Sequence, residues 1–347
     1  MEKRYYCSID IAKLVCSFLI VCIHTSPLSS LDGRMDSFLV NCISRVAVPF
    51  FFISSGFLLF SKMDEGRLNA AAVKAYIKRI LKLYIIWSAV YFPFMLLDIF
   101  KAGDGALKVL AGWAKNMVFS AGYGFLWYLP ATVVAVAAVS LLIKREVSIN
   151  KIIAAGFVLY VAGLFGQSYF GLINMIPFPE FIRRAAAAFL DFTVTTRNGV
   201  FEGFLFVALG ARLAHEKTLS RPRRSAAFLA VFTLLYILEF AVISKLDWQL
   251  EYDMYLFLVP VSYFFAKTVF TLRINPGRSV SGNIRAMSSL IYFTHMLFVE
   301  AFSIFTPSPN VNSLLAFFII ITATVVFDII VLVLSRTKAF AFLKNIY

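Results

Sequence analysis

Residues 313–335 read SLLAFFIIITATVVFDIIVLVLS, and Asp328 is the only charged residue among them. A helix that crosses the roughly 30 Å hydrocarbon layer of a membrane needs about 20 such residues, because each residue adds about 1.5 Å. This stretch therefore predicts a transmembrane helix, and it indicates the class of protein to which the rest of the chain belongs.

The composition of the whole chain agrees with a membrane protein. Of the 347 residues, 61% are hydrophobic and 15% are charged, whereas a soluble domain is nearer ~45–50% apolar and ~25% charged. These values exclude a disordered chain, a nucleic-acid-binding domain and an ordinary cytosolic enzyme.

Nine further apolar runs resemble the first one, so we predict an all-α polytopic membrane bundle with about ten spans. We expect a single membrane domain over residues 1–347, without a soluble domain. The first run lacks a small-residue cleavage site and begins with Asp10 and Lys13, so we expect it to remain as a helix. The predicted spans are 9–27, 38–60, 79–98, 125–143, 150–172, 199–214, 226–244, 252–272, 284–306 and 313–335.

The net charge of +14 is distributed unevenly along the chain. If both termini face the cytoplasm, 24 Lys and Arg residues lie on that side and nine on the other. Cytoplasmic loops of membrane proteins carry such an excess. The nine are Arg34, Arg45, Lys101, Lys108, Lys115, Arg183, Arg184, Arg197 and Lys245. The charge thus predicts an orientation and gives no reason to expect a nucleic-acid partner.

Several polar residues fall within the predicted spans, and two of the chain's three histidines, His24 and His295, are among them. An ionisable side chain that faces lipid is costly, so these residues are expected to face the interior. Neutral imidazole accepts and returns a proton near pH 7, which suits general base catalysis. With Arg45 and Glu202 at similar depth, the set favours a catalytic site, although hydrogen-bonded helix contacts or buried ion pairs remain open alternatives.

The run SRVAVPFFFISSGFLLF, residues 44–60, predicts a helix that Pro49 kinks and whose small residues 54–56 allow another backbone to approach. The outer connections 99–124 and 173–198 are expected to form interfacial or re-entrant helices. The four cysteines form no CxxC pair, so neither a disulfide framework nor a metal site is expected.

A basic segment, KAYIKRILKLY at 74–84, lies at the cytoplasmic end of the third span. Lys78 and Lys82 share a helix face, and Arg79 lies one turn from Lys82. Such a helix end can hold phosphates by charge-assisted hydrogen bonds. Anchoring to anionic lipid is an equally consistent interpretation.

In this order, these segments resemble a membrane acyltransferase family, acyltransferase 3. SIDIAKLVCSFLIVCIHT (8–25) resembles its first helix, with an acidic residue, a basic residue and a histidine at 10, 13 and 24. The run at 44–59 resembles its second-helix motif, YIKRILKLY (76–84) its RxxR helix, TRNGVFEGFLFVALG (196–210) its sixth-helix region, and SSLIYFTH (288–295) its Y-x-x-H element. Lys13 and Lys82 stand where the family usually has Arg, so charge is retained without bidentate geometry.

The resemblance implies a bacterial, multi-pass enzyme of the cytoplasmic membrane that passes an acyl group, expected to be acetyl, from cytoplasmic acetyl-CoA to a hydroxyl or amine of an envelope glycan or lipid-linked acceptor. Membrane lipids are its expected surroundings, and the oligomeric state is not predicted. The expected catalytic residues are His24, Arg45, His295, Glu202 and Tyr128; the donor-binding residues are Lys78, Arg79, Lys82, Lys13 and Asp10; and the acceptor-binding residues are Arg197, Asn198, Trp127 and Glu300.

Within the family, the resemblance is strongest to the membrane half of the membrane-bound serine racemases of vancomycin-resistance clusters. Those proteins carry a pyridoxal-phosphate racemase domain after the last span. The chain ends at Tyr347, so we expect neither that domain nor pyridoxal phosphate here. This resemblance implies an alternative function, transport of L-serine.

Overall fold

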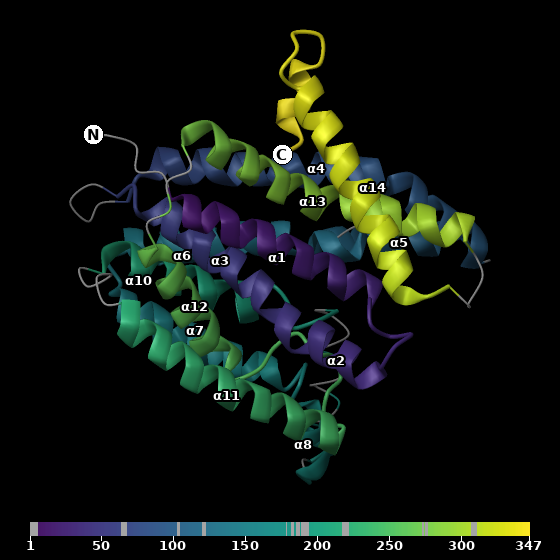
Figure 1. Cartoon of the computed structure of the whole chain (residues 1–347). Helices are drawn as coiled ribbons and strands as arrows, with labels where there is room; N and C mark the ends of the chain where they lie inside the picture. Colours follow the sequence, from purple (N-terminus) through teal and green to yellow (C-terminus); the bar gives the residue numbers. More distant parts are fainter. Residues whose placement is uncertain are drawn as a thin grey trace. The chain divides into compact units, whose positions relative to one another are not determined.

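The computed structural model describes residues 6–63, 68–102, 105–119, 123–177, 179–181, 184, 188, 194–216, 222–272, 274, 277–306 and 311–347. Over these residues the regular structure is helical and contains no strand (Figure 1). The prediction of an all-α bundle is confirmed.

Seven helical stretches within these ranges are long and apolar enough to cross a membrane. They contain α1 (Cys7–Thr25), α2 (Gly33–Asn41) with η1 (Ile43–Val46) and α3 (Ala47–Phe60), α4 (Ala70–Ala102), η2 (Gly124–Trp127) with α6 (Tyr128–Lys144), α11 (Pro222–Leu246), α13 (Arg278–Phe305) and α14 (Ser313–Leu334). The remaining three predicted spans correspond to α7 (Ile149–Leu164), α12 (Leu258–Thr271), and the π-helical turn η3 (Gly199–Gly203) with α10 (Phe204–His215).

Two predicted spans are longer than the helices that form. The span 150–172 ends as α7 at Leu164, and a turn over 165–169 separates it from α8 (Phe170–Met175). The span 252–272 begins as α12 only at Leu258. Polar contacts hold both non-helical segments, and a hydropathy pattern does not reveal such contacts.

The second span is interrupted at η1, and Pro49 is the third residue of α3. The interruption agrees with the predicted kink, because a proline ring clashes with the carbonyl four residues earlier, here that of Arg45 in η1. Proline is tolerated in the first turn of a helix because the amide that it lacks has no intrahelical partner there.

The first outer connection contains a helix, as predicted, because α5 spans Ala106–Phe119. Much of the second connection, 173–198, lies outside the described residues, so its prediction is tested only at its ends. All four cysteines are buried and free.

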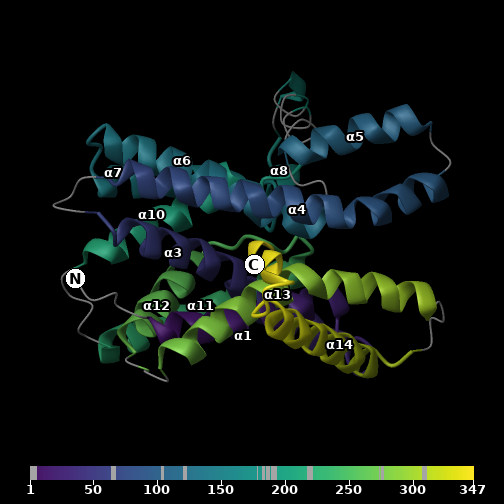
Figure 2. The same cartoon turned by 90° about the horizontal axis from the view of Figure 1, so that it is seen from above.

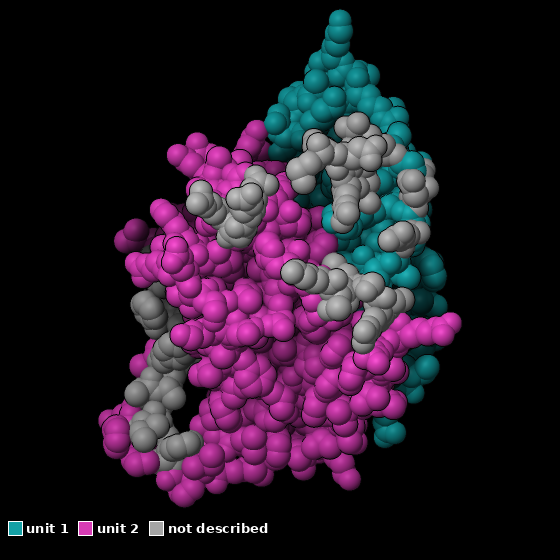
Figure 3. All heavy atoms as spheres, turned by 90° about the vertical axis from the view of Figure 1, so that its left-hand side faces the viewer, with its two compact units in different colours: residues 1–48, 268–347 teal, residues 49–267 magenta. Residues whose placement is uncertain are grey.

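The chain divides into two compact units, residues 1–48 with 268–347 and residues 49–267 (Figure 3). In unit 1, helices α1, α13 and α14 pack side by side (Figures 1 and 2). Ser30 and Ser313 join the ends of α1 and α14 by two reciprocal bonds, from each backbone N–H to the other's hydroxyl, at 3.0 and 2.8 Å. Asp32 caps α2, and the N–H groups of Met35 and Arg34 lower the pKa of its carboxyl.

In unit 2, helices α4, α6, α7 and α10 form the packed core, together with η3 (Figure 2). Gly56 of α3 lies directly against the backbone of Val207, and Gly210 of α10 lies against the backbone of Ile53. A side chain at either glycine would meet this backbone, so the close approach expected at residues 54–56 is confirmed. The pair Gly199 and Gly203 likewise contacts α6, at Ala131 and Ala135.

Candidate functional site

Two histidines meet inside unit 1. His24 lies in the last turn of α1 and His295 near the middle of α13, and their ring centroids are 5.3 Å apart. His295 is completely buried, whereas His24 is half-buried. The sequence predicted both residues for one site, and the packing of α1 on α13 brings them together.

The hydrogen bond of His295 determines which of its nitrogens can act as a base. Its Nδ1 lies 2.9 Å from the carbonyl oxygen of Ile291, one helical turn earlier. A carbonyl oxygen only accepts, so Nδ1 carries the hydrogen and, in the neutral ring, Nε2 carries the lone pair. The imidazole is thus held in one tautomer and one orientation.

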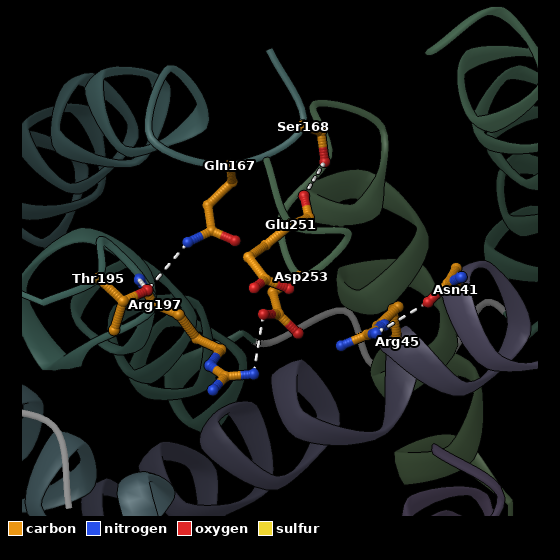
Figure 4. A network of polar contacts seen from close by, with 8 residues as sticks. All are labelled: Asn41, Arg45, Gln167, Ser168, Thr195, Arg197, Glu251 and Asp253. Atoms are coloured by element: carbon orange, nitrogen blue, oxygen red, sulfur yellow. Dashed lines mark hydrogen bonds and ion pairs between the residues drawn. The ribbon is translucent and has the colours of Figure 1, made fainter. Parts of the chain in front are cut away.

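Arg45 belongs to the same unit, on η1, which packs against α1. Its Nη2 donates to Oδ1 of Asn41 at 2.9 Å (Figure 4), so the guanidinium is held by the preceding helix α2. Glu300 is half-buried on α13, five residues after His295. The short helix η1 is what positions Arg45 beside α1, a detail that the predicted continuous span did not contain.

Asp10 has partners within the protein. Its carboxylate is buried, and it accepts from Ser281 Oγ at 2.6 Å and from Arg285 Nε and Nη2 at 3.0 Å each. These contacts support a structural role in holding α1 against α13, and the predicted donor contact stays a prediction. Lys13 is half-buried one turn further along α1.

A second polar cluster lies in unit 2 around Arg197. Its Nη1 donates to Oδ2 of Asp253 at 2.8 Å (Figure 4), and its guanidinium carbon lies 4.9 Å from the centroid of the Trp127 ring. Burial by itself would lower the pKa of Arg197, but the carboxylates of Asp253, Glu202 and Glu251 outweigh burial, so the pKa lies above its ordinary value. Arg197 therefore keeps its positive charge.

The segment before η3 is fixed by local hydrogen bonds. Asn198 caps η3, since its Oδ1 accepts from the N–H groups of Val200 and Phe201 at 2.9 and 3.1 Å. Thr195 Oγ1 accepts from the Arg197 N–H and from Gln167 Nε2, both at 3.0 Å. Asn198 thus has a capping role, while the predicted acceptor contact stays a prediction.

Sequence reasoning missed Asp253, Gln167 and Thr195. The first two fell inside the predicted spans 252–272 and 150–172, where they were read as helical. The sequence signal that could have identified these residues is a polar residue at the edge of an apolar run. Glu239 lies within the predicted span 226–244. Its carboxylate accepts from Tyr169 Oη at 2.6 Å and from the N–H groups of Leu256 and Phe257 at 2.6 and 2.8 Å, and thereby holds the segment that carries Asp253.

The predicted donor-binding residues Lys78, Arg79 and Lys82 are exposed on α4 of unit 2. The opposite face of this helix is buried through Val73, Ile80, Leu83 and Tyr84. Tyr128, at the start of α6, bonds with Ser55 of α3 at 3.1 Å. Among the described residues, no group of three histidine, cysteine or carboxylate side chains could hold a metal ion.

The predicted site residues thus fall into two sets. Unit 1 contains His24, His295, Arg45, Glu300, Asp10 and Lys13. Unit 2 contains Trp127, Tyr128, Arg197, Asn198, Glu202, Lys78, Arg79 and Lys82. Within the first set the structure brings His24 and His295 into contact, and within the second set it brings Arg197 against Trp127.

Comparison with known proteins identifies similar sequences. A family model described as an acyltransferase domain matches residues 7–333. An amino-acid racemase of Enterococcus faecalis is 27% identical over 339 residues, which are 94% of this chain and 46% of the relative. A serine/alanine racemase of Enterococcus gallinarum is 30% identical over 276 residues, or 78% of this chain and 38% of the relative. The chain thus spans less than half of these relatives, and no solved structure matches it.

Proposed function

The chain belongs to the membrane acyltransferase family that its residues 7–333 match, and from this premise we propose that it moves an acyl group, expected to be acetyl, from cytoplasmic acyl-CoA to a hydroxyl or amine of an extracytoplasmic envelope acceptor. The excess of Lys and Arg on the side assigned to the cytoplasm supports the proposed cytoplasmic entry of the donor. The proposal includes placement in a bacterial cytoplasmic membrane.

The observation that carries the proposal is the contact of His24 with His295, at 5.3 Å between ring centroids. Acyl transfer requires a base that takes the proton of the acceptor as its oxygen or nitrogen attacks the thioester carbonyl. The new bond to the carbonyl carbon forms, the carbon–sulfur bond breaks, and the proton passes to the departing thiolate. His24, half-buried and therefore reachable, is the proposed base, and His295 orients it or takes part in proton transfer.

Negative charge develops on the carbonyl oxygen during this step, and a fixed cation or donor lowers its energy. Arg45 suits this role because Asn41 holds its guanidinium and it belongs to the same unit as the histidines. Arg197 suits it less well, because its charge is already balanced by Asp253. The exposed Lys78, Arg79 and Lys82 are the proposed contacts of the CoA phosphates.

The proposal predicts that His24→Gln abolishes most of the activity. Purified protein would be incubated with labelled acetyl-CoA and envelope extract, and acetylated product would be quantified by mass spectrometry. We expect the rate to fall by at least about a hundredfold, the usual contribution of a general base. The matched control is His215→Gln, which alters the third histidine, exposed at the end of α10, and should leave the rate unchanged. Full activity in His24→Gln would contradict the role given to His24.

Transport of an amino acid is the second candidate, because the relatives are named racemases of amino acids and a membrane domain similar to theirs could carry such a substrate. A zwitterion needs partners for its carboxylate and its ammonium, and the chain offers Arg45 and Arg197 for the first and Glu202, Glu300 and Asp328 for the second. Uptake of radiolabelled L-serine by proteoliposomes would support transport. Acetyl-CoA binding without serine uptake would favour the acyltransferase.

A further inference from the structure

Asp328 is a carboxyl group inside unit 1 that has no role in the proposed acyl transfer. It lies in α14, which packs beside α13 in Figures 1 and 2, and its side chain is completely buried. Its Oδ1 lies 2.9 Å from Oγ1 of Thr294 on α13, and its Oδ2 has no hydrogen-bond partner among the described residues. A carboxylate that is buried with so few contacts is costly when it is ionised.

The hydrogen bonds of Thr294 indicate which form of Asp328 fits. A hydroxyl group has one hydrogen to donate, and its oxygen also accepts. Thr294 Oγ1 lies 2.9 Å from the carbonyl oxygen of Leu290 as well, and that oxygen only accepts. An ionised Asp328 would compete with Leu290 for the single hydrogen. If the carboxyl carries a proton, its O–H donates to Thr294, Thr294 donates to Leu290, and each hydrogen has one acceptor.

Within the part of the chain that the structure describes, no cation pairs with Asp328. The main elements that pack against α14 are α1, α13 and η4 (Ala341–Asn345). The charged and imidazole side chains described on them are Asp10, Lys13, His24, Arg285, His295, Glu300 and Lys344. None of these forms an ion pair with Asp328, and Arg285 pairs with Asp10 instead. Burial without a cation favours the neutral acid over the carboxylate.

We propose that Asp328 is a proton-binding site, which holds a proton at neutral pH and donates it in a hydrogen bond to Thr294. Carboxyl groups within membrane spans mark proton relays in pumps and transporters. Thr294 directly precedes His295, so α13 carries the partner of this acid and a member of the histidine pair in consecutive positions. A neutral Asp328 offers no charge to an ammonium group, so of the carboxylates named for transport only Glu202 and Glu300 remain.

Infrared spectroscopy separates the two forms, because the carbonyl stretch of a protonated carboxyl lies at higher frequency than the bands of a carboxylate. Spectra of the full chain in lipid nanodiscs at pH 7, where aspartic acid in water is ionised, would be compared with those of Asp328→Asn. The asparagine amide can donate to Thr294 as the acid does. We expect this variant to lose one protonated-carboxyl band. Loss of carboxylate bands instead would overturn the proposal.

The matched control is Asp10→Asn, which alters a buried carboxylate of the same unit that has a cation. Asp10 accepts two bonds from Arg285 and one from Ser281, and such partners favour the ionised form. This variant should therefore lose carboxylate bands and keep the protonated-carboxyl band. Loss of the protonated-carboxyl band in Asp10→Asn would assign that band to Asp10 and overturn its assignment to Asp328.

Variants of Thr294 test the hydrogen bond in a chain that keeps Asp328, so they remain informative even if Asp328→Asn does not fold. Thr294→Val has nearly the same shape but no oxygen to accept, so the band should move to higher frequency. Thr294→Ser keeps the hydroxyl group and should leave the band in place. A band at the same frequency in both variants would contradict donation to Thr294. These spectra do not depend on acyl transfer, so their failure is distinguishable from failure of the proposed function.

Discussion

Asp10 is a buried carboxylate within the membrane-spanning part of the chain. Its two oxygens accept three hydrogen bonds, from Ser281 and from Arg285, whose side chain is 52% exposed. A buried carboxylate that loses its cationic partner keeps its desolvation cost, so removing one partner is worse than removing both. The arrangement identifies Arg285 as the residue on which the contact of α1 with α13 depends at this end.

We predict that Arg285→Gln lowers the free energy of unfolding by about 1–3 kcal/mol, because it leaves Asp10 without its cation. The double variant Asp10→Asn, Arg285→Gln should be less destabilised than the sum of the single variants. A double-mutant cycle of denaturant unfolding in detergent measures the coupling. Arg336→Gln, which loses one exposed bond to Asn283, is the control. Additive effects in the cycle would contradict a coupled pair.

At the level of single residues, the sequence predicted one site for His24 and His295, but it did not predict the partner of Arg197. His24 and His295 were expected together because both lie in spans, and the structure confirms their contact. The partner of Arg197 could not be predicted, because Asp253 lies 56 positions away and its place depends on how α7, α11 and α12 end. Contacts between distant segments follow from packing, which apolar periodicity does not encode.

Among the elements, α3 and α10 show how small residues fix the distance between two helices. Gly56 and Gly210 let the two backbones meet, as the run SSG predicted for α3. The same sequence did not predict where α7 ends or where α12 begins. Their flanking residues are apolar enough to continue a helix, while bonds to Glu239 and within the Gln167 turn hold them in other conformations.

We predict that Gly210→Val destabilises unit 2, because the added side chain meets the backbone at Ile53 and Phe57, which cannot move aside as a side chain does. The expected loss is about 1–3 kcal/mol, as for overpacking of a core. Thermal unfolding in detergent measures it. Gly282→Ala is the matched control, because nothing lies within 4 Å of its added carbon, and it should be neutral or slightly stabilising. Equal stability of the two variants would contradict the close approach.

For the whole molecule, the distribution of charge predicts the orientation of the chain in the membrane. The 24 Lys and Arg residues assigned to the cytoplasmic side include the basic face of α4 and the loop before α11. The nine others include Arg197 and Lys245. With this assignment, we expect the proposed CoA contacts and the Arg197 cluster to lie on opposite sides of the membrane.

We predict that Arg224 faces the cytoplasm and Leu250 the outside. In a background without the four native cysteines, a membrane-impermeant maleimide applied to intact cells should label Leu250→Cys. It should label Arg224→Cys only after permeabilisation. Both side chains are exposed, so access across the membrane, and not burial, decides the labelling. Labelling of Arg224→Cys in intact cells would reverse the orientation.

The stacking of Arg197 on Trp127 has an optical consequence. Indole emission responds to a nearby charge, and the guanidinium lies 4.9 Å from the centre of this ring. The chain has four tryptophans, so replacing the other three, Trp87, Trp113 and Trp248, with Phe would isolate this signal. Any molecule that displaces Arg197, or alters its pairing with Asp253, would then change the colour or yield of the fluorescence. The protein thus contains its own reporter of events at this cluster, one that needs no knowledge of the reaction.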